Sequence, residues 1–260
     1  MLQLLFGGTS LCTNLWIRFA RRILLMILQN HPAAQIKVPD STQRSAFKAA
    51  IRSKYPLLEN VWGSMDGLKV PIQEANDDLV QGRYYNGWLH GHYLTNLLLL
   101  FTPDGRVALA ALGAPGSCHD STLAKLSGIY SKIDRVFAED GGQIVGDSAF
   151  LKYRSPAIMK SAATGRDRGR GGNEGRLGTI EGQATNLRQS SEWGMRALQG
   201  SFPRIRDVMK FEDEQSKENM VTLCFLVHLY NYRAAIVGQN QIQSVYMPQM
   251  TTFGNVALLW

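Results

Sequence analysis

The chain has 260 residues, a net charge of +7 at pH 7 and three cysteines. This length suits one large domain, or one domain with an appendage, and the positive charge favours a polyanionic partner, nucleic acid first. Cys12, Cys118 and Cys224 lie far apart and form no CxxC pair, which argues against a zinc site, a disulfide framework and an oxidising compartment. No apolar run approaches the ~18 residues of a membrane span, and the apolar opening 1–6 lacks the basic leader of a signal peptide.

The first 58 residues are expected to be helical. Apolar residues recur at three- and four-residue steps in 1–30, and they define one face of a helix: Leu15, Phe19, Ile23, Met26 and Ile27. Such a helix is either the remnant of a DNA-binding helix-turn-helix or an amphipathic helix packed on the main domain with a solvated basic face. We favour the second interpretation, because one helix does not define the motif. Asp40 and Gln43 then form a capping-box pattern that begins a second helix, which Pro56 ends.

From Val61 the pattern changes to strands. Alternation over 61–70 predicts a strand, the loop 74–81 is polar, and the turn 103–105 joins two further apolar strands, 93–102 and 106–113. A helix opens at His119–Thr122, with inner residues Leu123, Leu126, Ile129 and Ile133. A short strand then runs into Asp147. Antiparallel strands followed by a helix and a further strand predict a ribonuclease-H-like α/β domain, a mixed sheet flanked by helices, over residues 59–237.

The second half of the chain adds a loop and two helices. Segment 164–178 is rich in Gly and Arg, which predicts a mobile loop that either meets phosphates or is only a solvated insertion. Ser190-Ser191 is expected to cap a helix that turns Glu192 toward the fold. A buried helix is expected over roughly 214–237, and the tail 238–260 carries little signal.

Four acids stand at the ends of predicted elements: Asp66, Asp120, Asp147 and Glu192. Hard cations such as Mg²⁺ or Mn²⁺ prefer carboxylate ligands, and two such ions about 3.5–4 Å apart catalyse phosphodiester cleavage. Each acid also has a purely structural interpretation. Asp66 suits a turn and Asp120 a helix cap, Asp147 suits a loop hydrogen bond, and Glu192 can pair with Arg188 or Arg196 at four-residue steps. The residues alone leave both interpretations open.

The amino-acid sequences of four segments are a more specific signal than the spacing of the acids. They are Met65-Asp66-Gly67-Leu68-Lys69-Val70, Pro115-Gly116-Ser117-Cys118-His119-Asp120-Ser121, Gly146-Asp147-Ser148-Ala149-Phe150 and Ser191-Glu192-Trp193-Gly194-Met195-Arg196-Ala197-Leu198. Together they resemble the Harbinger-type DDE transposases and the host proteins derived from them, in the right order over roughly Val61–Ala235. The segment Cys224–Asn231 is similar to the family's closing helix.

The resemblance implies a metal-dependent DNA endonuclease that also joins strands, located in the nucleus, with DNA as its partner and no membrane. It implies that Asp66, Asp120, Asp147 and Glu192 bind Mg²⁺ or Mn²⁺. We expect Asp66, Asp120 and Glu192 to form the catalytic triad, with Asp147 as a supporting ligand.

The chain also departs from the family. Leu68 stands where a small polar residue is usual, and only the end of the family's upstream helix-turn-helix region fits before Thr42. A separate DNA-binding partner protein would then bring the chain to DNA. The alternatives are a catalytically inactive, transposon-derived protein that binds DNA or protein, and a nuclease that acts on RNA or hybrids.

Overall fold

The computed structural model describes residues 7, 9–87, 89–147, 150, 155–161, 177–209, 213–238 and 240–248, without the side chains of 92–96 and 213–216. The strands are β1 (Val61–Pro71), β2 (Tyr85–Asn86), β3 (Gly91–Phe101), β4 (Val107–Ala111), β5 (Gln143–Gly146) and β6 (Ile158–Lys160). The helices are α2 (Ser10–Asn30), α3 (Ser41–Lys54), α4 (Asp78–Tyr84), α5 (Asp120–Leu126), α6 (Ile129–Asp140), α8 (Ile180–Ser201), the short η2 (Pro203–Ile205), α9 (Asp213–Val237) and α10 (Gln241–Tyr246).

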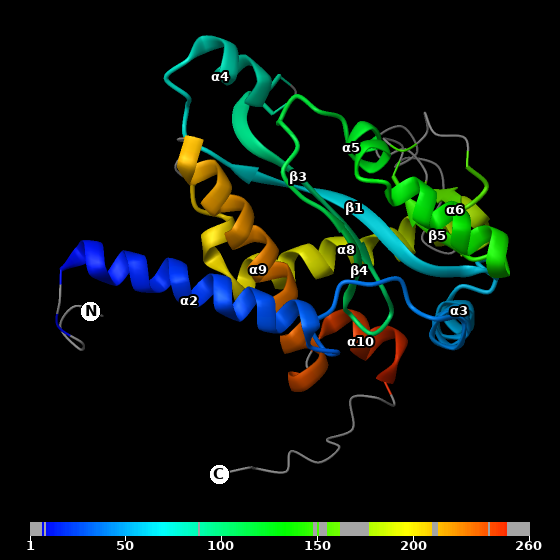
Figure 1. Cartoon of the computed structure of the whole chain (residues 1–260). Helices are drawn as coiled ribbons and strands as arrows, with labels where there is room; N and C mark the ends of the chain where they lie inside the picture. Colours follow the sequence, from blue (N-terminus) through cyan, green and yellow to red (C-terminus); the bar gives the residue numbers. More distant parts are fainter. Residues whose placement is uncertain are drawn as a thin grey trace, which may run out of the picture.

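The strands form one mixed sheet in the order β2-β3-β1-β5-β6, with β4 also paired to β3. The pairs β1–β3 and β3–β4 are antiparallel, whereas β5 is parallel to both β1 and β6. This arrangement confirms the expected ribonuclease-H-like α/β fold. The long β1 therefore lies at the centre, where the antiparallel half of the sheet meets the parallel half (Figure 1).

Helices cover both faces of the sheet, and β3 shows why. Leu97 and Leu99 are buried in one core cluster with residues of α8 and α9, whereas Leu98 and Leu100 are buried in the other with residues of α5 and α6. Side chains that alternate between two apolar faces are typical of a strand buried on both sides. A continuous run of four leucines is therefore what the central part of this sheet requires.

The helix expected after His119 is two helices. Gly128 adopts a left-handed conformation with φ 72° between α5 and α6, which a chain with a side chain at that position rarely adopts. Leu126, expected on the inner face, is 76% exposed, while Ile129 and Ile133 are buried. The Gly-containing turn thus divides the expected apolar stripe.

Two other boundaries differ from expectation. Helix α8 begins at Ile180, capped by Thr179, so that Ser190 and Ser191 lie inside it and are buried. Both serines hydrogen-bond to Ser64 of β1, which replaces the capping role expected from sequence. Helix α4 begins within the expected polar loop, because the Asp77 carboxylate caps it by accepting from the N–H groups of Leu79 and Val80.

Helix α2 packs on α9, but with the opposite face from the one expected (Figure 1). The stripe Leu15, Phe19, Ile23, Met26 and Ile27 is 37–59% exposed. Arg21 is partly buried and donates to Thr222, whereas Arg22 is 60% exposed and forms an ion pair with Glu218. The prediction of a solvated basic face is therefore wrong for Arg21, while Arg22 remains largely solvated as it pairs with the buried carboxylate of Glu218 on α9.

The C-terminal elements complete the core. Helix α9 confirms the helix expected over 214–237, and its Val227 and Tyr230 are buried. By length and hydropathy alone, Lys217–Val237 would suffice to cross a membrane, a property that core helices share. Helix α10 lies within the expected tail and buries Ile242 and Tyr246 in the same cluster. Residues 164–176 of the expected mobile loop lie outside the described residues.

Candidate active site

Asp66 lies on β1, and Asp147 directly follows β5, the parallel strand beside it. Ser64 of β1 lies opposite Val145 of β5, and two residues further along each chain come Asp66 and Asp147. Parallel neighbours in a sheet are about 4.8 Å apart, and residues two positions apart share a face. Because Ser64 contacts α8, that face is the one that α8 covers. The Asp66 carboxylate therefore lies beneath α8, and Asp147 is near enough for its charge to raise the pKa of Asp66.

Asp120 approaches β1 at the next residue, Gly67. A Cβ atom built on Gly67 would lie 2.5 Å from Oδ2 of Asp120, so the carboxylate rests directly against the strand. Asp120 is the first residue of α5, and its neighbour His119 is the N-cap and makes no side-chain capping hydrogen bond. Asp120 is thus not the capping residue of its helix. Alternation along β1 places this carboxylate on the other side of the strand from the Asp66 side chain.

Glu192 is joined to Asp66 through an arginine. On α8, Arg188 places Nη1 3.3 Å from Oδ2 of Asp66 and Nη2 3.3 Å from Oε1 of Glu192. The Arg188 side chain is only 14% exposed, and its Nε is buried without a hydrogen-bond partner. Glu192 itself is 40% exposed, so it faces the fold only partly. The sequence suggested the Arg188–Glu192 pair from its four-residue spacing, but not the contact with Asp66.

The electrostatics of Asp66 are dominated by its burial. Burial raises its pKa to about 6, above the model-compound value of 3.8. The N–H of Gly67, which donates to Oδ1 at 2.9 Å, and the charge of Arg188 oppose this rise, while Asp147 and Asp120 add to it. One guanidinium therefore does not neutralise the site. A carboxylate that is desolvated and crowded by other acids is favourable to a bound cation.

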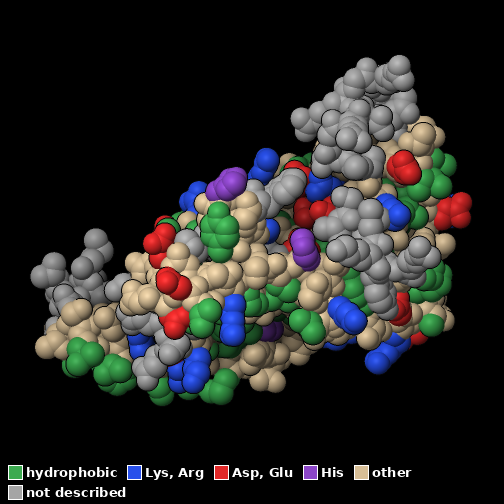
Figure 2. Space-filling model, turned by 90° about the horizontal axis from the view of Figure 1, so that it is seen from above, with side chains coloured by type: hydrophobic (Ala, Val, Ile, Leu, Met, Phe, Trp, Pro, Cys, Tyr) green, Lys and Arg blue, Asp and Glu red, His purple; other side chains and the backbone are tan. Residues whose placement is uncertain are grey.

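The structure thus brings Asp66, Asp120 and Asp147 into electrostatic range of one another and connects Glu192 to Asp66. Within the described part of the chain, no three His, Cys, Asp or Glu side chains are arranged as a complete metal site. The donors are nonetheless of the type that Mg²⁺ and Mn²⁺ prefer. The face seen from above in Figure 2 shows acidic side chains near its middle, with Lys or Arg and His side chains beside them.

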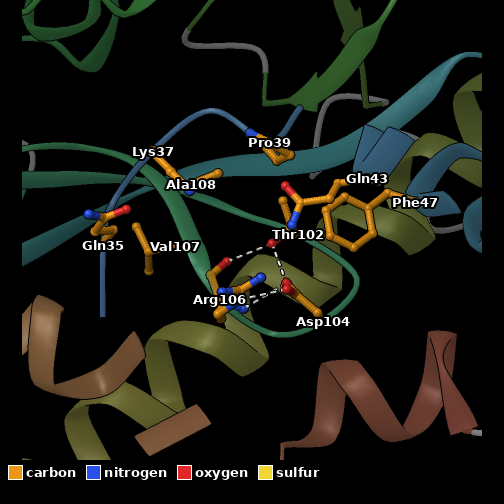
Figure 3. A pocket seen from close by; sticks show the side chains of 10 residues that line it. All are labelled: Gln35, Lys37, Pro39, Gln43, Phe47, Thr102, Asp104, Arg106, Val107 and Ala108. Atoms are coloured by element: carbon orange, nitrogen blue, oxygen red, sulfur yellow. Dashed lines mark hydrogen bonds and ion pairs between the residues drawn. The ribbon is translucent and has the colours of Figure 1, made fainter. Parts of the chain in front are cut away.

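A second polar group, at the β3–β4 turn, is structural. Thr102 donates to Asp104 at 2.5 Å, and Nε of Arg106 donates to the same carboxylate at 2.6 Å (Figure 3). The pocket beside them has a volume of only about 30 Å³, far below the roughly 300–1,000 Å³ of ligand pockets. This charge pair therefore fixes the turn and leaves no room for a substrate.

Comparison with known proteins gives one match. A family model described as DDE superfamily endonuclease matches residues 65–228. The match covers more than half of the chain and includes all four acids and Arg188, but not α2 or α3. Searches of the curated proteins and of the solved structures give no match.

The raised pKa of Asp66 predicts a pH-dependent stability. A group whose pKa is raised on folding stabilises the folded state only while it is protonated, so ionised Asp66 destabilises it. From 3.8 to about 6 is about two pKa units, or roughly 2–3 kcal/mol at most. We expect Asp66→Asn to raise the free energy of unfolding by up to this amount at about pH 7.5, and the gain to fade as the pH falls through 6 toward 4.

Urea unfolding at both ends of this pH range, without divalent cations, measures the effect. Asp207→Asn, which removes an exposed carboxylate, is the matched control and should show no such pH dependence. A wild-type protein as stable as Asp66→Asn at neutral pH would show that Asp66 is not desolvated.

The contact between Gly67 and Asp120 predicts that Gly67→Ala weakens Mn²⁺ binding with little effect on stability. The added methyl group would meet the Asp120 carboxylate at 2.5 Å. Because this carboxylate ends a flexible side chain, we expect it to move away while β1 stays in place. The melting temperature should therefore change little, and Mn²⁺ binding should fall to the level of Asp120→Ala. Gly82→Ala, where a Cβ meets nothing within 4 Å, is the control. Unchanged Mn²⁺ binding in Gly67→Ala would remove Asp120 from the site.

Proposed function

Because the chain belongs to the DDE superfamily endonucleases, we propose that it is a divalent-metal-dependent DNA endonuclease of the Harbinger transposase type. The single observation that carries this proposal is the desolvated Asp66 on β1, whose pKa is raised further by Asp147, the residue that follows the parallel strand β5. The Harbinger assignment is supported by the Pro115-Gly116-Ser117-Cys118-His119-Asp120-Ser121 segment. Action on chromosomal DNA would place the protein in the nucleus.

The strand pairing supports Asp147 rather than Asp120 as the partner of Asp66. Asp147 follows β5, the parallel neighbour of β1, and α8, which carries Glu192, contacts Asp66, whereas Asp120 approaches β1 at Gly67. We therefore assign Asp66, Asp147 and Glu192 to hold the divalent cations, with Asp120 as a supporting acid. The expectation from sequence gave Asp120 the primary place and Asp147 the supporting one.

When bound, divalent cations supply an activated nucleophile and neutralise the departing oxyanion. Asp66, Asp147 and Glu192 would hold these cations, and Asp120 would support them. In hydrolysis, a water oxygen bonds to phosphorus and the bond from phosphorus to the 3′ oxygen breaks. The 3′ oxygen takes up a proton, which leaves a 3′-hydroxyl and a 5′-phosphate. In strand joining, that hydroxyl attacks a second phosphodiester in the same way, so no nucleophilic side chain is needed.

Arg188 has two tasks in this scheme. In the arrangement seen here it partly neutralises Asp66 and Glu192, which would otherwise repel each other across the site. Its 3.3 Å contacts are longer than the 2.7–2.9 Å typical of charge-assisted hydrogen bonds, and its Nε is unsatisfied. A cation between the two acids would take over this neutralisation and release the guanidinium toward a substrate phosphate.

The same observation supports a second candidate function. If Arg188 remains in place, Asp66 and Glu192 form a permanent ion-pair network, and the chain is a catalytically inactive, transposon-derived protein that binds DNA or another protein. The incomplete metal arrangement of the described acids supports this candidate. The two candidates differ in whether the acids bind a divalent cation.

Nicking of supercoiled DNA in the presence of Mn²⁺ tests the proposed activity. We expect wild type and Asp207→Asn to nick at equal rates, and Asp147→Ala to lose activity by more than about 100-fold, beyond the 10–100-fold typical of residues around a metal site. Asp120→Ala should lose less. DNA, RNA and hybrid substrates compared side by side identify the preferred polymer. Equal nicking by wild type and Asp147→Ala would refute the assignment.

Titration with Mn²⁺ by calorimetry separates the two candidates. Arg188→Met removes a competing cation, so we expect Mn²⁺ to bind on the order of tenfold more tightly than to wild type, a difference of about 1.4 kcal/mol. Arg196→Met removes an exposed charge from the same helix and should change the affinity little. No Mn²⁺ binding by either wild type or Arg188→Met would favour the inactive candidate. If wild type bound Mn²⁺ and Arg188→Met did not, Arg188 would instead be needed to hold the acids in position.

A further inference from the structure

A polar hollow of about 280 Å³ lies between α2, η2 and α9, and it shares no residue with the acids described above. Its walls include Asn14, Arg18, Arg21, Arg204, Glu218 and Thr222. Two of its arginines come from α2, which lies outside the stretch that matches the endonuclease family, and the third comes from η2, which lies inside it. The hollow therefore exists only because α2 packs on the nuclease core.

Positive charge exceeds negative charge in this hollow. Three arginines line it, and Glu218 is the only acid among the described lining residues. Glu218 is 7% exposed and already forms an ion pair with a fourth arginine, Arg22, from outside the hollow. Arg21 donates to the hydroxyl of Thr222 at 2.7 Å, a neutral partner. Among the described residues that line the hollow, the arginines therefore outnumber the acid by three to one.

The clustered arginines repel one another, and a bound anion would relieve this repulsion. Burial lowers the pKa of Arg21; Glu218 opposes this effect, and Arg204 and Arg18 add to it. Like charges that are held together and partly desolvated are unfavourable, and such places are candidates for function. The guanidinium group offers donors in a planar fork that matches the oxygens of a phosphate, and phosphates are the anions for which arginine clusters are best suited.

We infer that this hollow is a second nucleic-acid contact, in which Arg18, Arg21 and Arg204 bind backbone phosphates of the DNA that the active site cuts. The inference rests on the proposed function for the identity of the strand, but the charge and the shape of the hollow stand without it. It gives α2 a role: this helix adds two arginines to a core that already supplies Arg204. Glu218, beneath them, holds α2 in place through Arg22.

The test is DNA binding without catalysis. The fluorescence anisotropy of a fluorescein-labelled DNA duplex is measured over a range of salt concentrations, with EDTA present. We expect Arg18→Ala and Arg204→Ala each to raise Kd about tenfold and to lower the slope of log K against log salt by about one. Both side chains are exposed, so the variants should fold, which circular dichroism checks. Arg52→Ala, at an exposed arginine of α3, loses the same charge and should bind like wild type.

The outcomes separate this inference from the proposed function. If the Arg18 and Arg204 variants bind DNA like Arg52→Ala, the inference is overturned, whether or not the wild type nicks DNA. If they lose affinity while Asp147→Ala binds like wild type, the hollow is confirmed as a DNA contact even when no nicking is found. Inorganic phosphate that binds the wild type as tightly as the duplex does would assign the hollow to a small anion and overturn the inference.

Discussion

The structure depends on a carboxylate at a place where water is largely excluded. Asp66 lies at the centre of the sheet, on a strand with partners on both sides, and its side chain is only 15% exposed. Ionising a buried carboxylate is unfavourable unless a positive charge is near. Among the described residues, Arg188 supplies such a charge to Asp66, and the pKa of Asp66 nevertheless stays raised to about 6. The remaining negative charge makes this end of the sheet suited to a cation.

The sheet and α8 together determine which acids meet. β5 ends at Gly146, whereas β1 continues to Pro71, so the strands part where Asp66 and Asp147 stand. Ligands in α/β sheets commonly bind where the chain leaves the carboxyl ends of parallel strands. Helix α8 lies close to the sheet because its Gly194 has no side chain: a Cβ there would come within 2.5 Å of the Phe101 ring. This close packing brings the arginine and the glutamate of α8 over the strands.

Local signals in the sequence predicted a large part of this fold. The alternation in β1, the leucine run of β3 and the capping box of α3 each depend on residues a few positions apart, and each was found. The errors come from contacts that are distant in sequence. Ser190 and Ser191 are predicted as caps but hydrogen-bond to Ser64, and Arg21 is predicted to be solvated but is partly buried and donates to Thr222. Arg188 joins Asp66 to Glu192. Asp66 and Arg188 are 122 residues apart in the sequence, and no periodic pattern predicts a contact over that separation.

If the substrate is DNA, the acidic active site needs a separate, positively charged surface that binds the strand. Four carboxylates repel a phosphodiester backbone, and divalent cations only locally reverse that repulsion. Affinity for the rest of the strand must therefore come from positive charge elsewhere on the surface, and backbone phosphates supply most of the binding free energy of such complexes. The net charge of +7 shows that the chain has this positive charge in excess. The hollow beside α2 concentrates part of it, apart from the acids, at a place lined by arginine donors that suit a phosphate.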